Sequence, residues 1–494
     1  MRPPPAVRSW QEPHKLLWAW GLVSGLLVAG AAALAWGSPR FAYEIEVIET
    51  PAAAFGVGLA LASLVWLAIV PLVRASERQD VTSQRAALTA ILVTGLLMRA
   101  FAAASTPILE DDWYRYLWEG GLWANGLSPY AIAPADAAEV LDPAVNGLAE
   151  SAGQILARVN HPHLKTIYPP VAQTAFAIAH LIEPWSFAAW RAVSLLLDLS
   201  IALVLLGILD ALGRSRLWVA LYWLNPVVVK ELVNTAHMEG VLMLPVVGAL
   251  LLALRGRHVA ATLVMGLAVG AKVWPLLLLP LILRPLLGDW SRLALALVLL
   301  ALLGAGIAWP IIVGGLDETS GFLAYAEHWQ SNSALFPALQ FIMAQWIGLL
   351  GLTEEALASL ASRLARAAMG GFALLIALAL SLRPIAGPRD LTHRMSMIVF
   401  AIVLLSPAQF PWYMVWMIPF LAIMPIPGLL VAVVTTPLYY TYFHYSSRDL
   451  GDLFRTRMVW VIWLPVWLVL LADAWRAWRN RAIDSASSEP TPHA

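Results

Sequence analysis

The sequence predicts an all-α fold, a polytopic bundle of about 11–14 transmembrane helices. Of its 494 residues, 60% are hydrophobic and only 13% are charged, whereas soluble domains carry roughly 25% charged residues. The mean hydropathy is +0.73. Apolar runs of about 20 residues recur along the chain, and each can cross the hydrocarbon core of a bilayer. The lipid bilayer is therefore the first partner that we expect.

The first expected span covers residues 16–36 and follows a short basic segment. It is longer than the roughly 7–15 residues of a signal-peptide core, so we expect it to remain uncleaved. Several later apolar runs are too short to cross alone, which predicts broken or re-entrant helices. The other expected spans lie near residues 51–73, 86–109, 191–212, 217–230, 240–254, 259–283, 293–313, 335–352, 366–382, 395–411, 428–443 and 458–474.

The distribution of charge between the spans predicts the orientation. Segments assigned to the cytoplasm carry 18 Lys and Arg against five acids, and those assigned to the outside carry eight cations and 18 acids. By the positive-inside rule we expect both termini in the cytoplasm and the long polar segment 110–168 outside. Residues 1–482 then form one transmembrane domain, and 483–494 a disordered cytoplasmic tail. The orientation requires residues 169–183 to be interfacial or re-entrant, which the sequence leaves open.

Composition also excludes several classes of function. Lys and Arg number 31, as do Asp and Glu, and cysteine is absent. There is no basic excess for a nucleic acid, and there are no thiolate metal sites, disulfides or cysteine nucleophiles. Gly266, Gly270 and Lys272 lack the Ser/Thr and the preceding strand of a nucleotide-binding P-loop.

The external segment opens on a run of acids, Glu110, Asp111 and Asp112. Asp111, Arg115 and Glu119 are spaced four residues apart and share one face of a helix. One interpretation is an amphipathic helix at the headgroups, with Asp111 or Asp112 as its N-cap and a salt-bridge ladder behind it. The other is that the paired carboxylates act as a general base, as metal ligands, or as both.

Further polar residues could face the same cavity. Lys272 lies in an apolar run, so it is either functional, snorkelling, or paired with Glu231 or Glu239. Arg99 and Arg191 lie near span ends, where we expect them to snorkel, and Asp198 could pair with Arg191 or cap a helix contact. The candidate residues for this outer cavity are Asn160, His161, His163, Lys165, Tyr168, Asn225, Lys230, Glu231, Asn234, His237, Glu239 and Lys272.

Acids, histidines, lysines and a tyrosine at the outer mouth of a bundle favour chemistry with a donor available on that side. Nucleotide-linked donors are cytoplasmic, so the donor must be carried by a lipid. Lys165, Lys230 and Lys272 would then suit a lipid phosphate as the leaving group, and a carboxylate would activate the hydroxyl of the acceptor.

At these residues the chain resembles the GT-C superfamily of membrane glycosyltransferases, and within it the bacterial polyprenyl-phosphate-dependent mannosyltransferase-like group (glycosyltransferase 87 / DUF2029 type). Four stretches carry the resemblance: Asp111–Gly120 continuing to Gly126–Tyr130, Asn160–Pro170, Asn225–Glu239 and Pro411–Tyr413.

The resemblance implies inverting transfer of a hexose such as mannose from a polyprenyl phosphate to a glycan, lipid or protein acceptor on the external face of a bacterial inner membrane. Asp111 or Asp112 would be the base. Metal dependence varies within the superfamily, so a divalent cation is compatible with the site and no ligand set is assigned. Residues implied to contact the donor phosphate or substrate are Tyr114, Arg115, Glu119, His161, Lys165, Tyr168, Lys230, Glu231, His237, Glu239, Lys272, Trp412 and Tyr413.

Two other classes fit parts of the pattern. A secondary transporter or lipid-carrier flippase would also have broken helices and an intramembrane lysine, although transporter sites usually lie at the midplane between symmetric halves. An inactive relative that serves as an assembly subunit is the third hypothesis, and the intact acid pair argues against it.

Overall fold

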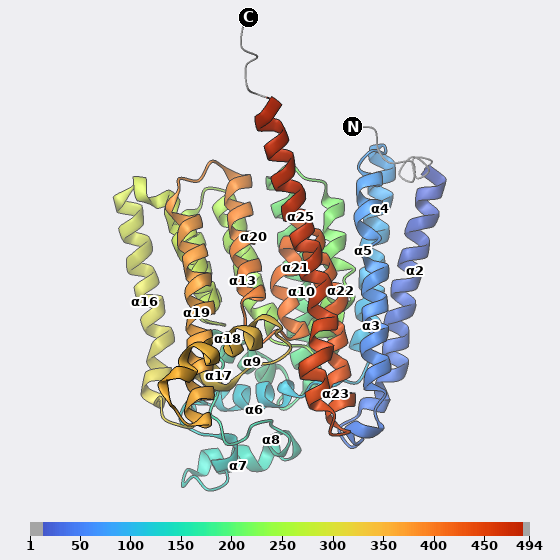
Figure 1. Cartoon of the computed structure of the whole chain (residues 1–494). Coiled ribbons are helices and arrows are strands. Elements are labelled where there is room, and N and C mark those ends of the chain that lie inside the picture. Colours follow the sequence, from blue (N-terminus) through green and yellow to red (C-terminus); the bar gives the residue numbers. More distant parts are fainter. Residues whose placement is uncertain (1–12, 488–494) are drawn as a thin grey trace, which may run out of the picture.

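The computed structural model describes residues 13–487, and in that range the chain is a bundle of helices without a β-strand (Figure 1). This confirms the all-α polytopic class. Seven helical segments are long and apolar enough to cross a membrane by length and composition. They contain α2 (Pro13–Gly37), α3 (Ala52–Trp66) with α4 (Ile69–Ser76), α5 (Val81–Ala103), α10 (Phe187–Ala211), α16 (Trp290–Gly314), α19 (Glu354–Leu382) and α25 (Val459–Ser487).

Shorter helices complete the bundle, as the short apolar runs predict. The run 259–283 is broken, because α14 ends at Val269 and a 3₁₀ turn starts at Trp274. The total of 11–14 spans stays a prediction. The shorter helices are α9 (Pro170–Ile182), α11 (Ala220–Trp223), α12 (Pro226–Val229), α13 (Glu239–Leu254), α14 (His258–Val269), α15 (Leu279–Leu283), α17 (Gly321–His328), α18 (Leu335–Ile347), α20 (Pro388–Leu404), α21 (Met414–Ile423), α22 (Pro427–Thr435), α23 (Thr441–Ser446) and α24 (Gly451–Leu453).

The segment 110–168 folds into α6 (Asp112–Ala124), α7 (Pro143–Ala152) and α8 (Gln154–Ala157). These helices lie at one end of the bundle, whereas the start of α2 and the end of α25 lie at the other (Figure 1). Helix α25 runs to Ser487, and the remainder of the expected tail, 488–494, lies outside the described residues.

Helix α6 is buried, so its aromatic residues pack against protein and do not anchor it in lipid headgroups, as the amphipathic interpretation expected. All residues from Tyr114 to Leu122 are buried. The helix packs against α9, where the ring of Tyr116 stacks on Phe176 with centroids 4.6 Å apart. A Cβ added at Gly120 would lie 2.5 Å from the carbonyl oxygen of Phe176. Only glycine permits this approach of the two backbones, which fixes α6 against the bundle.

A buried ion pair joins α5 to α10, and it corrects two predictions. Arg99 does not snorkel: it is 3% exposed, and its Nε donates to Asp198 at 2.5 Å. Asp198 therefore pairs with Arg99 and not with Arg191, whose guanidinium donates to the carbonyl oxygens of Ala103, Ser105 and Asn234. Both arginines end up serving contacts between helices.

Candidate active site

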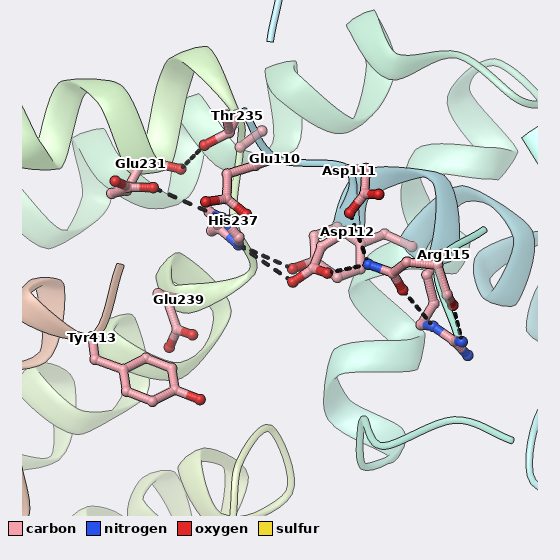
Figure 2. A network of polar contacts seen from close by, with 12 residues as sticks. Glu110, Asp111, Asp112, Arg115, Glu231, Thr235, His237, Glu239 and Tyr413 are labelled. Carbon is pink, nitrogen blue, oxygen red and sulfur yellow. Dashed lines mark hydrogen bonds and ion pairs between the residues drawn. The ribbon is translucent and has the colours of Figure 1, made fainter. Parts of the chain in front are cut away.

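Asp111 and Asp112 lie at the start of α6 and line a cavity of about 680 Å³. The side-chain amide of Asn160 donates to Asp111 Oδ1 at 2.9 Å and to Asp112 Oδ1 at 2.7 Å. Asp111 precedes the first helical residue but makes no capping hydrogen bond. Figure 2 shows the two carboxylates side by side, and Asn160 thereby holds both at the cavity wall.

Burial changes the proton affinity of these acids. It raises the pKa of Asp111 to about 6, with a second contribution from the negative charge of Asp112, while the hydrogen bond from Asn160 acts in the opposite direction. Burial also raises the pKa of the neighbouring Glu110 well above its ordinary value, and the charge of Lys230 offsets part of that increase. A carboxylate with such a pKa is a stronger base than a solvated aspartate, as general base catalysis requires.

Arg115 fixes one wall of the cavity. It forms the expected i,i+4 ion pair with Glu119, at 3.1 Å. Its guanidinium also donates to the carbonyl oxygens of Asn160, His161 and Leu164 at 2.5, 2.8 and 3.2 Å. Glu119 is buried below the cavity wall, so the pair orients residues 160–164 against α6.

Behind Asp112 lies a buried polar cluster that lines no part of the cavity. Lys230 and Glu231, on a single π-helical turn after α12, pair at 3.2 Å and share hydrogen bonds with the Tyr440 hydroxyl. His237 lies between this pair and the acids, with Nδ1 3.8 Å from Asp112 and Nε2 3.7 Å from Glu231 (Figure 2).

Lys272 pairs with Glu239, which was one of the alternatives predicted from the sequence. Its Nζ lies 2.8 Å from Glu239 Oε1, and the indole of Trp416 donates to Glu239 Oε2 at 2.5 Å. The ammonium also lies 4.5 Å from the ring centroid of Tyr413 and 4.8 Å from that of Trp416. Lys272 and Glu239 both line the cavity.

The structure brings most of the other candidates to the cavity. Lys165 reaches the rim and pairs with Asp317 at 2.5 Å. The ring of Trp412 stacks on His237 at 4.4 Å. Tyr114 lies away from the cavity, where it stacks on Trp113 and accepts a hydrogen bond from Arg158. The cavity-lining candidates are Asp111, Asp112, Arg115, Asn160, His161, Lys165, Tyr168, Glu239, Lys272, Trp412 and Tyr413.

The cavity residues that the sequence reasoning missed include Tyr325, Trp329 and Arg366. Tyr325 and Trp329 belong to α17 and the loop after it, where the only signal was the aromatic residues. Arg366 opens an expected span, and an arginine at that point also fits a snorkelling role. Within residues 13–487, no group of three His, Asp or Glu side chains is arranged to hold a metal ion.

A helical membrane bundle with tandem acids that line a large cavity agrees with the GT-C class of glycosyltransferases, which the sequence resembles. Comparison with known sequences narrows the class: the chain belongs to the alpha-(1->6)-mannopyranosyltransferase family, whose N-terminal domain model matches residues 16–287.

The chain is 26% identical over 287 residues to alpha-(1->6)-mannopyranosyltransferase A of Mycobacterium tuberculosis. That match covers 53% of this chain and 51% of the relative, so it spans about half of either protein. No solved structure matches the chain.

Proposed function

We propose that the protein transfers mannose from a polyprenyl-phosphate donor to an acceptor hydroxyl, with the Asp111–Asp112 pair as the source of the general base. The observation that carries the proposal is the placement of both carboxylates, joined through Asn160, on the wall of a 680 Å³ cavity. The family supports mannose as the sugar.

In this reaction the acceptor oxygen attacks C1 of the sugar and the bond from C1 to the phosphate oxygen breaks. The proton of the acceptor passes to a carboxylate of the acid pair, and the electron pair of the broken bond stays on the lipid phosphate. Attack on the face opposite the phosphate inverts C1. The raised pKa of Asp111 supports this role, because a carboxylate that binds a proton more tightly removes it more effectively.

The cavity suits a lipid-linked donor, since charged and apolar surfaces meet in it. Its lining includes Lys272, Arg115 and the acids as well as apolar residues such as Leu277 and Ile402. A sugar phosphate can contact the charged residues and a prenyl chain the apolar ones. Ligand sites commonly combine apolar walls with a few placed polar groups.

We place the site on the external face of a bacterial inner membrane, with both termini in the cytoplasm. The charge asymmetry between segments supports this orientation. The position of α6 opposite the start of α2 and the end of α25 agrees with it (Figure 1).

The test is transfer from synthetic polyprenyl-phosphate mannose by the full chain in lipid nanodiscs, measured as release of polyprenyl phosphate. We expect Asp111→Asn, Asp112→Asn or both to lose roughly 10²–10⁴-fold in rate. The matched control is Asp136→Asn, an exposed acid of the same segment, which should keep the wild-type rate.

Wild-type transfer in the double Asp111→Asn/Asp112→Asn variant would overturn the assignment of the base. Movement of the donor across vesicle membranes without any released polyprenyl phosphate would instead identify a flippase and overturn the transferase.

A further inference from the structure

Four basic side chains line the cavity: Arg115, Lys165, Lys272 and Arg366. The first three are each paired with a carboxylate. Arg115 pairs with Glu119 at 3.1 Å, Lys165 with Asp317 at 2.5 Å, and Lys272 with Glu239 at 2.8 Å. Their charges are largely neutralised by the protein itself.

Arg366 differs from these three. Among residues 13–487 no carboxylate lies within 4 Å of its guanidinium, which donates one hydrogen bond, from Nη1 to the carbonyl oxygen of Trp329 at 3.0 Å. Its Nε is buried and has no partner. The guanidinium lies 4.9 Å from the ring centroid of Phe336, which fixes its position without neutralising it. Partial burial of a cation with unused hydrogen-bond donors costs free energy unless an anion pairs with it.

The surface beside Arg366 is apolar. Met369, Gly370 and Ala373 follow it at i+3, i+4 and i+7, so they share one face of α19, and all three line the same cavity. Glycine and alanine leave room along the helix. A cation beside an apolar helix face suits a ligand with a charged head and a hydrocarbon chain.

We propose that Arg366 binds the phosphate of the lipid-linked donor, whose hydrocarbon chain lies along Met369–Ala373. This inference rests on the proposed function and adds a specific donor contact to it. The planar guanidinium can bind two phosphate oxygens at once. It exchanges no proton: it stabilises the negative charge that grows on the phosphate as the bond to C1 breaks. Arg366 lies outside residues 16–287, which the family model matches, so that model gives it no role.

The experiment compares Arg366→Gln and Arg366→Lys with the control Arg363→Gln, an exposed arginine one turn earlier on α19. Binding of polyprenyl phosphate to protein in phosphatidylcholine nanodiscs is counted by native mass spectrometry. We expect Arg366→Gln to weaken binding by about 10- to 100-fold, Arg366→Lys to restore part of it, and Arg363→Gln to match wild type. Binding of polyprenol, which lacks the phosphate, should be equal in all four proteins.

In the transfer assay, Arg366→Gln should raise KM for the donor by a similar factor and lower kcat as well. Unchanged binding of polyprenyl phosphate by a monodisperse Arg366→Gln protein would overturn the inference. So would full displacement of polyprenyl phosphate by phosphatidylglycerol, which would assign the site to bulk anionic lipid.

Binding of polyprenyl phosphate can be measured without sugar transfer, so the Arg366 site and the proposed transferase function can be refuted independently. Wild-type protein that binds polyprenyl phosphate through Arg366 but transfers no sugar would leave this site standing and overturn the proposed function.

Discussion

Arg99 and Arg366 both belong to long apolar helices, and their surroundings differ in one respect. Arg99 is completed by the protein: Asp198 takes two of its donors, the carbonyl oxygens of Gly95 and Trp223 take others, and the ring of Trp223 lies 3.4 Å from Cζ. Arg366 has a single carbonyl partner and faces a cavity. A buried arginine that is paired with a carboxylate of the bundle holds helices together. An arginine that has no carboxylate partner and faces a cavity is available to bind a ligand.

The largest effect that tests this comparison should come from Asp198→Asn. The substitution leaves the charge of Arg99 buried without its counterion, and loss of one partner of a buried pair costs about 3–5 kcal/mol. We expect a large drop in the midpoint of thermal unfolding in detergent, while folded molecules keep their transfer rate.

The matched control is Asp210→Asn on the same helix, where Asp210 pairs with Arg216 at the surface. Its unfolding midpoint should stay close to that of wild type, because exposed pairs contribute little. Equal shifts for both variants would contradict the distinction between a buried structural pair and a surface pair.

A smaller effect should follow from Gly120→Ala, which tests how α6 is held. The added Cβ would press on the carbonyl oxygen of Phe176 at 2.5 Å, and such overpacking typically costs about 1–3 kcal/mol. Because α6 carries the acid pair, transfer should decrease along with stability. Gly147→Ala in α7, where nothing lies within 4 Å of the added Cβ, should change neither. A fully active Gly120→Ala protein would show that α6 tolerates displacement from α9.

The parts of the structure that could be predicted from sequence rest on short-range patterns. Apolar run length gives the helical membrane class, and spacing along one helix gives the Arg115–Glu119 pair. Glu239 was one of the two partners predicted for Lys272, because few acids lie in the neighbouring apolar runs. In each case composition or helical periodicity limits the alternatives.

The remaining features depend on how helices pack, which no short-range pattern encodes. Arg99 and Asp198 are 99 residues apart, and no sequence pattern around either residue identifies the other as its partner. The aromatic residues of α6 have the composition of a headgroup helix, yet Tyr116 is buried against Phe176 of α9 and Trp118 is buried against Trp185. The isolation of Arg366 is visible only when every acid around the cavity has been located.

The smallest expected effect concerns the pH dependence of transfer. Burial and the charge of Asp112 raise the pKa of Asp111 to about 6. If the reaction needs Asp111 ionised, kcat/KM is maximal well above this pKa, is about half-maximal near pH 6, and falls about tenfold per pH unit below it. Asn160→Ala removes the hydrogen bond that favours ionised Asp111, so its acid limb should move to higher pH. The measurement is kcat/KM between pH 5 and 8, a range that extends about one unit below and about two units above the pKa of Asp111. Asp136→Asn is the control and should keep the wild-type profile. A flat profile down to pH 5, or an acid limb that Asn160→Ala leaves in place, would show that the ionisation of Asp111 does not limit the reaction.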